Sequence, residues 1–200
     1  MQLLMVGASP YARKVLALAV ERGIRDRIDV VIENPHVRPA ALVAANPLSK
    51  VPTLIADNGE AHVDSFAICS FLDTMGDAPP LLPLNGVQRW SVLQRHALAN
   101  GVMDCSVARR VESLLAPDKD RLAGMERQRA TTGRVLDRFE QDLDKFADSI
   151  ALDTLTLACG LSYLDLRFPE DNWRAGRPAL TAWHAAFEQR PCMLQTTYFT

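Results

Sequence analysis

In the first part of the chain, short apolar runs alternate with segments of helical periodicity. We expect strands where the apolar runs are short and bounded by turn residues, and helices where apolar positions recur every three or four residues. The expected strands cover residues 3–6, 28–32, 53–56 and 61–63, and the expected helices cover residues 12–22, 39–45 and 66–75. This order, β-α-β followed by β-β-α, is typical of an α/β domain.

Beyond residue 86 the apolar positions follow helical periodicity, and no segment has a convincing strand pattern. The expected helices cover residues 87–115, 119–146, 153–168 and 178–190. The third is the most apolar and should be the most buried. A proline-containing stretch at residues 77–85 indicates a linker. We therefore expect an α/β domain at residues 1–76, a linker at 77–85 and an all-α bundle at 86–200.

Ser9 stands between the first expected strand and the first expected helix. Ser is a favoured N-cap and proline is favoured in the first helical turn, so Ser9-Pro10 should begin the helix. Unpaired amides and the positive end of the helix dipole converge at such a position. The Ser9 hydroxyl could therefore cap the helix or hold an anion, and the local sequence leaves both open.

The composition argues against several function classes. A hydrophobic content of 48% with 23% charged residues is that of a soluble globular protein, and a net charge of −2 gives no basic field for nucleic acid or an anionic membrane. We see neither a secretory signal nor an apolar stretch near the roughly 18 residues of a membrane span. The four cysteines are far apart and the four histidines are scattered, which argues against a metal site or a disulfide framework. We expect a cytoplasmic protein.

Three motifs in order carry a family resemblance. Residues 9–15 are SPYARKV, residues 46–54 are NPLSKVPTL, and Asp64 is followed by Ser65. Together they resemble the thioredoxin-like domain of cytosolic glutathione transferases, whose second half is helical. Residues 157–174 resemble a bacterial subgroup of this family, so the resemblance covers essentially the whole chain. It implies a thioredoxin-like N-terminal domain, glutathione as co-substrate and a homodimer.

The resemblance assigns glutathione contacts to residues of the α/β domain. It implies a cis peptide bond before Pro52, with the backbone of Val51 pairing with glutathione like an added strand. Ser65, expected to cap the next helix, would offer amides to the γ-glutamyl carboxylate, and Asp64 would hold the ammonium group. Lys50 is a weaker candidate for the glycyl carboxylate. The alternatives are a trans proline, a helix cap without a ligand and a solvated lysine.

In the same resemblance, Ser9 would stabilise the glutathione thiolate. The thiolate is the reactive form, and lowering a thiol pKa of about 8.5 by two units requires about 2.7 kcal/mol. A hydrogen bond to a charged group supplies about 1.5–3 kcal/mol, and a helix N-terminus adds about 0.3–1 kcal/mol. Ser9 is therefore expected to donate a hydrogen bond to the sulfur and not to act as a nucleophile.

The second substrate, a hydrophobic electrophile, is expected to bind between the domains. Tyr11, Met103, Val107 and Trp173 are candidates for its pocket by composition only, and each is more commonly a core residue. The leading hypothesis is a glutathione transferase acting in detoxification. Two alternatives stay open: a non-catalytic protein of the same fold that binds a protein or small ligand, and a glutathione-dependent peroxidase, isomerase or dehalogenase.

The third expected helix departs from the family pattern at its start. The family places a Ser or Thr cap three residues before the aspartate that corresponds to Asp153. Here that position is Ile150, while Ser149 lies one residue earlier. Either the cap is shifted, or the start of this helix is less stable by up to about 1 kcal/mol.

Overall fold

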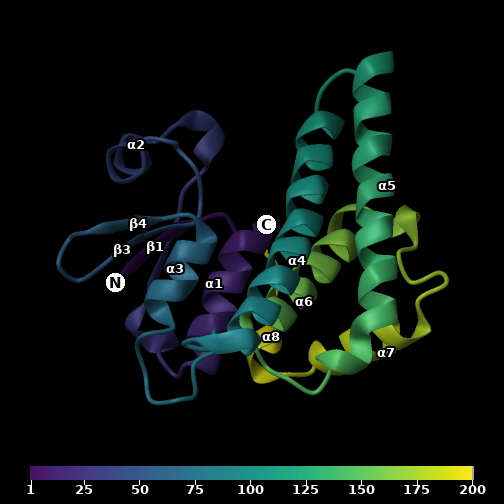
Figure 1. The fold of residues 1–200 in the computed structure, drawn as a ribbon. Helices are drawn as coiled ribbons and strands as arrows, with labels where there is room; N and C mark the ends of the chain where they lie inside the picture. The colour runs from purple at the N-terminus through teal and green to yellow at the C-terminus, as the bar shows by residue number, and fades with distance from the viewer. Residues whose placement is uncertain (200) are drawn as a thin grey trace. The chain divides into compact units, whose positions relative to one another are not determined.

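The chain forms two compact units in a computed structural model that describes residues 1–199 (Figure 1). Unit 1 contains Met1–Leu82 together with the segment from Arg190 onward, and unit 2 contains Pro83–Gln189. In the part of the chain that the structure describes, no helix is both long enough and apolar enough to cross a bilayer.

Unit 1 is built on a mixed four-stranded sheet with the strand order β2-β1-β3-β4 (Figure 1). The strands are β1 (Gln2–Met5), β2 (Asp29–Ile32), β3 (Thr53–Ile55) and β4 (Ala61–Val63). β1 runs parallel to β2 and antiparallel to β3, which is antiparallel to β4. Leu3 lies in the middle of this sheet and is fully buried. The predicted β-α-β and β-β-α arrangement is confirmed.

Unit 1 contains four α-helices within its described residues. They are α1 (Pro10–Glu21), α2 (Ala40–Ala45), α3 (Ser65–Leu72) and the short α8 (Pro191–Leu194). Single turns of 3₁₀ helix, Arg25–Arg27 and Pro35–Val37, flank β2. Gly23, at a φ of 69°, ends α1, because the following amides fold back onto the carbonyls of its last turn. α1 and α3 pack side by side (Figure 1).

The boundaries of unit 1 differ from the predicted ones at both ends. The amides of Leu81 and Leu82 donate to the Asp73 carboxylate at 2.8 Å each, so most of the expected linker belongs to this unit. Residues 190–199, expected in the helical domain, also pack in unit 1, where Arg190 pairs with Glu21 at 3.3 Å. Contacts of this kind cannot be predicted from the periodicity of apolar residues. The short helix α8 was also not predicted.

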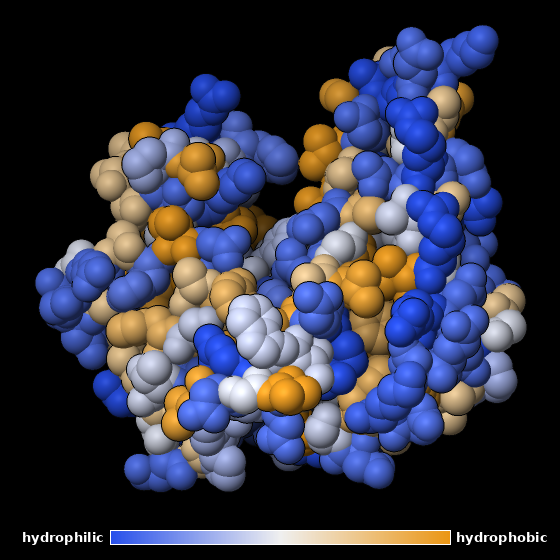
Figure 2. All heavy atoms as spheres, in the orientation of Figure 1, coloured by the Kyte–Doolittle hydropathy of each residue, from blue (hydrophilic) through white to orange (hydrophobic). Residues whose placement is uncertain are grey.

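All the regular secondary structure of unit 2 is helical, as expected. It contains α4 (Gly86–Ser113), α5 (Lys119–Asp142), α6 (Leu152–Arg167) and α7 (Pro178–Phe187), with 3₁₀ turns at Leu143–Lys145 and Pro169–Asp171. α6 is buried from Leu152 to Leu164 and contacts α4 and α7, which makes it the centre of this core. The outer face of α5 is covered by hydrophilic side chains (Figure 2).

The start of α6 uses neither of the caps considered from the sequence. Its N-cap is Ala151, whose methyl group cannot accept a hydrogen bond. Thr154 Oγ1 instead accepts from the Ala151 N–H at 3.0 Å, which is one half of a capping box. Asp153 is only 1% exposed and forms an ion pair with Arg95 at 2.5 Å. The aspartate therefore ties α6 to α4.

Candidate functional site

The register of the sheet brings the three sequence motifs to one edge of unit 1. Thr53, the first residue of β3, lies between Leu4 of β1 and Val63 of β4. β1 and β4 therefore end at the edge where β3 begins. The N-terminus of α1 at Ser9, the loop before Thr53 and the N-terminus of α3 at Asp64 all follow at this edge. We call it the site edge.

Ser9 caps α1 while its hydroxyl proton stays available. The Ser9 N–H donates to the carbonyl of Val6 at 3.1 Å, which closes the turn after β1, and Oγ accepts from the Ala12 N–H at 3.2 Å. A hydroxyl that accepts through its oxygen can still donate its proton, and no residue among 1–199 accepts that proton. Ser9 is 7% exposed. The two roles left open by the sequence, cap and donor, are therefore compatible.

The peptide bond between Val51 and Pro52 is cis, as predicted. Val51 is half-buried, and within residues 1–199 its backbone N–H and C=O make no hydrogen bond. Backbone groups of this kind are normally paired with protein or water. Val51 thus offers one donor and one acceptor to an extended ligand at the site edge.

A side-chain brace that sequence reasoning missed holds this loop. Asn46 is buried, and its Nδ2 donates to the Lys50 carbonyl and to Thr53 Oγ1, at 3.0 Å each. Thr53 Oγ1 in turn donates to the Lys50 carbonyl at 2.8 Å. Asn46 Oδ1 accepts from the Leu48 N–H. The spacing of Asn and Thr around Pro47 and Pro52 was the only available signal. The Lys50 side chain itself is exposed, with no partner within residues 1–199.

The N-cap of α3 is Asp64 and not Ser65, which corrects the prediction. Asp64 Oδ1 accepts from the amides of Phe66 and Ala67 at 2.7 and 3.3 Å. These amides lie two and three residues after Asp64, which is the N-cap geometry. Ser65 is then the first helical residue, and it is buried.

Asp64 also has a φ of 71°, a conformation that is uncommon for a residue other than glycine. Such a backbone costs of order 1–3 kcal/mol and is typical of ligand sites. The carboxylate is exposed, and its second oxygen has no partner within residues 1–199. Asp64 can thus cap the helix with one oxygen and hold a cation with the other.

The four candidates for the second-substrate pocket fall into two groups. Met103 is fully buried, with its Cγ 3.3 Å from where a Cβ on Gly160 of α6 would lie, and Trp173 is buried and donates to Asp165 at 2.8 Å. Both belong to the core of unit 2. Tyr11 on α1 and Val107 on α4 are half-buried, and for them the pocket stays a prediction.

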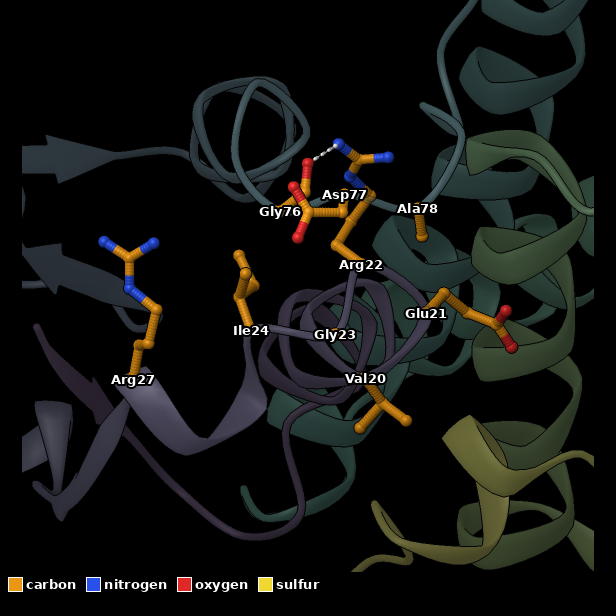
Figure 3. Close-up of a pocket in the computed structure, with 9 residues that line it drawn as sticks. All are labelled: Val20, Glu21, Arg22, Gly23, Ile24, Arg27, Gly76, Asp77 and Ala78. Carbon is orange, nitrogen blue, oxygen red and sulfur yellow. Dashed lines mark hydrogen bonds between the residues drawn. The ribbon is translucent and has the colours of Figure 1, made fainter.

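A cavity of about 470 Å³ lies at the other end of α1 from Ser9 (Figure 3). Arg22 reaches from the end of α1 to the carbonyls of Met75 and Gly76, at 2.6 and 3.0 Å, and these contacts form one wall. α1 has 12 residues and is about 18 Å long. This cavity is therefore separate from the site edge, and Arg22, one of the two arginines that line it, already fixes the chain after α3.

No group of three or more His, Cys, Asp or Glu in residues 1–199 could hold a metal ion. The chemistry of the site edge consists of a hydroxyl donor, backbone groups, a carboxylate and two helix N-termini. Such an arrangement fits a ligand with an extended backbone, a carboxylate, an ammonium group and one group that accepts from Ser9.

Sequence comparison finds a matching protein family and a related protein. Residues 8–75 match the family described as "Glutathione S-transferase, N-terminal domain". The chain is 33% identical over 178 residues to the uncharacterized GST-like protein YibF of Escherichia coli, with 86% of each chain covered.

Solved structures extend the similarity to both units. A glutathione transferase family member from Pseudomonas fluorescens, solved with bound glutathione, is 38% identical with a TM-score of 0.95, over 100% of this chain and 99% of that one. A glutathione S-transferase from Methylobacillus flagellatus, also with glutathione bound, is 32% identical with a TM-score of 0.90, over 99% of both chains. Unit 1 is thus a thioredoxin-like domain, and the chain belongs to the glutathione S-transferase family.

Proposed function

We propose that the protein is a glutathione transferase that binds glutathione at the site edge of unit 1. The observation that carries this proposal is the convergence there of Ser9, Val51 before the cis Pro52, and Asp64. The relatives from Pseudomonas fluorescens and Methylobacillus flagellatus, whose structures contain glutathione, support it.

Each contact of glutathione follows from the chemistry of the residue. The cysteinyl backbone pairs with the N–H and C=O of Val51, as an added strand would. The γ-glutamyl carboxylate binds the amides at the start of α3 beside Ser65, and the free oxygen of Asp64 holds the ammonium group. Lys50, exposed on the same loop, is the candidate for the glycyl carboxylate.

Ser9 donates its free hydroxyl proton to the glutathione sulfur. Its Oγ is already polarised by the Ala12 N–H, and the helix N-terminus adds positive potential. Both effects favour the thiolate over the thiol, so the sulfur is ionised at neutral pH and its proton passes to solvent. The thiolate then forms a C–S bond with an electrophilic carbon, and the leaving group departs with its electron pair.

The test is direct. Purified protein is titrated with glutathione by calorimetry, and then assayed with glutathione and a panel of aryl halides, hydroperoxides and alkyl halides. Binding with conjugation of at least one electrophile is the expected result. Binding without turnover on any of them would favour the non-catalytic alternative, and turnover of hydroperoxides alone would favour a peroxidase. Absence of binding at millimolar glutathione would overturn the proposal.

We also propose a homodimer. Apolar side chains stand exposed at the start of α4, among them Val87 at 82% and Trp90 at 66%. Exposed apolar groups of this size on neighbouring turns mark protein–protein contact surfaces. Mass measurement in solution tests this, and Trp90→Glu should convert a dimer to monomer. A wild-type mass of a single chain at micromolar concentration would refute it.

A reducing compartment such as the cytoplasm fits the four cysteines, none of which forms a disulfide within residues 1–199. Conjugation of hydrophobic electrophiles there would serve detoxification.

A further inference from the structure

The C-terminal tail of unit 1, residues 193–199, is hydrogen-bonded to the turn that leads into Ser9. The Phe199 N–H donates to the carbonyl of Gly7 at 3.4 Å. Gly7 is two residues before Ser9, so their Cα atoms are at most about 7 Å apart. Chain termini are normally poorly ordered unless they are tied down. In this chain the segment up to Phe199 is held against the turn before Ser9, where the thiolate is proposed to bind.

Phe199 occupies the space that a side chain at position 7 would need, and this position is a glycine. A Cβ built on Gly7 would lie 2.3 Å from the Phe199 carbonyl oxygen and 2.5 Å from the nearest atom of its ring. No real Cβ tolerates such contacts, so the glycine allows the backbone and the ring of Phe199 to rest directly on the turn.

Arg13, one helical turn after Ser9, makes a second set of contacts with the tail. The Arg13 side chain is buried, and its Nη2 donates to the carbonyl of Met193 at the end of α8 at 3.2 Å. Its guanidinium also lies 4.8 Å from the centre of the Tyr198 ring, within the range of a cation–π interaction. α8 itself packs on α1. Residues 193–199 therefore run back along the first turn of α1.

Phe199 is held in this way and yet remains 49% exposed. Burial in the fold does not account for its position, because about half of its surface is left in water. A half-exposed aromatic ring that lies against the turn before Ser9 is suited to stacking on a flat apolar group carried by the sulfur that Ser9 would bind.

We propose that Phe199 is a specificity-determining residue: it forms the apolar wall against which an aromatic electrophile stacks while the glutathione thiolate attacks. This inference rests on the proposed function. With chlorodinitrobenzene, the thiolate forms a C–S bond to the ring carbon that carries chlorine, and chloride leaves with the bonding electron pair. The residue touches the electrophile and not the tripeptide.

The test compares ligands that differ only in what the sulfur carries. Dissociation constants for glutathione, S-methylglutathione and S-(dinitrophenyl)glutathione are measured by calorimetry on the wild type, Phe199→Ala and Phe199→Trp. Phe199→Ala should weaken binding of the dinitrophenyl conjugate by roughly three- to tenfold and leave the other two within twofold. Phe199→Trp, which keeps an aromatic wall, should restore it.

The matched control is Leu194→Ala. Leu194 lies on α8 in the same C-terminal segment and is 56% exposed, similar to Phe199. Its substitution should leave all three constants unchanged. Gly7→Ala should reproduce the loss of Phe199→Ala, because a Cβ displaces the tail, and the double variant should add little to either single one.

The outcomes separate this inference from the proposed function. If Phe199→Ala changes the three dissociation constants by the same factor, or changes none, the electrophile wall is overturned while glutathione binding stands. If the wild type binds none of the three ligands, the proposed function fails and this inference fails with it.

Discussion

Asn46 donates a hydrogen bond to the hydroxyl of Thr53 at 3.0 Å, across the loop that carries Val51 and the cis Pro52. Both side chains are buried. Neither touches the proposed ligand groups of the loop, yet together with the Lys50 carbonyl they fix its shape. The shape of the loop proposed to bind glutathione is thus maintained by two buried side chains that are not themselves proposed to contact the ligand.

Replacement of Thr53 by valine tests this brace. Valine has nearly the same shape but leaves Asn46 Nδ2 and the Lys50 carbonyl with fewer partners, so the free energy of unfolding should fall by about 1–3 kcal/mol. Glutathione binding should weaken roughly three- to tenfold because Val51 is less well positioned. Thr53→Ser retains both hydrogen bonds and should keep wild-type affinity. Chemical denaturation and calorimetry measure the two effects. Equal behaviour of the two variants would contradict the role of the hydroxyl.

Ser9→Ala removes the proposed donor to sulfur. Loss of a hydrogen bond to a charged group, about 1.5–3 kcal/mol, should lower kcat/KM at neutral pH roughly 10- to 150-fold and raise the pKa of bound glutathione. The deficit should shrink at alkaline pH, where the thiol ionises unaided. Thiolate absorbance against pH measures the pKa, and Ser9→Thr, which keeps a hydroxyl, is the control. A pKa that is the same in Ser9→Ala and wild type would mean that Ser9 only caps α1.

Asp64→Asn separates the cap of α3 from the charge. Asparagine caps a helix as well as aspartate and tolerates a positive φ, so the free energy of unfolding should change by less than about 0.5 kcal/mol. Glutathione binding should weaken roughly tenfold, because the ammonium group loses its carboxylate partner. A glutathione analogue that lacks the amino group should bind both proteins equally. If Asp64→Asn still bound glutathione more tightly than this analogue, the ammonium group would be recognised elsewhere, and Asp64 would be only a cap.

Arg95 and Asp153 predict a pH-dependent stability in unit 2. Burial raises the pKa of Asp153, and the hydrogen bond and charge of Arg95 oppose that rise. Arg95→Met leaves an uncompensated buried carboxylate, so it should cost about 3–5 kcal/mol of unfolding free energy at neutral pH.

The sign of the pH dependence follows from linkage. Where the folded pKa lies above the unfolded one, the native state binds more protons, so stability is greatest below the unfolded pKa and falls as pH rises through the folded pKa. Denaturation of Arg95→Met should therefore show the smallest loss at acidic pH. The variant Arg95→Met/Asp153→Asn should recover most of the loss at neutral pH. A pH-independent cost would show that Arg95 acts through packing alone.

Local rules predicted most of the secondary structure. Ser9-Pro10 marked the start of α1 because N-cap and first-turn preferences depend only on neighbouring residues. The same rules misplaced the cap of α3 by one residue, since both Asp64 and Ser65 are good caps and only the observed backbone distinguishes them. Met103 and Trp173 could not be separated from pocket residues, because composition does not reveal which face of a helix is covered.

By itself, the sequence determined the succession of strands and helices and the two-part organisation, because periodicity and capping are local. It also contained the three motifs from which glutathione binding is proposed. Only the tertiary structure decided what lies together. Register around Thr53 brought the three motifs to one edge, and Asn46 fixed the loop of the second motif through its hydrogen bonds. Because Gly7 has no side chain, Phe199 of the C-terminal segment can pack directly on the turn between β1 and α1. Such contacts join residues far apart in the chain, and their energies depend on geometry that no local pattern records.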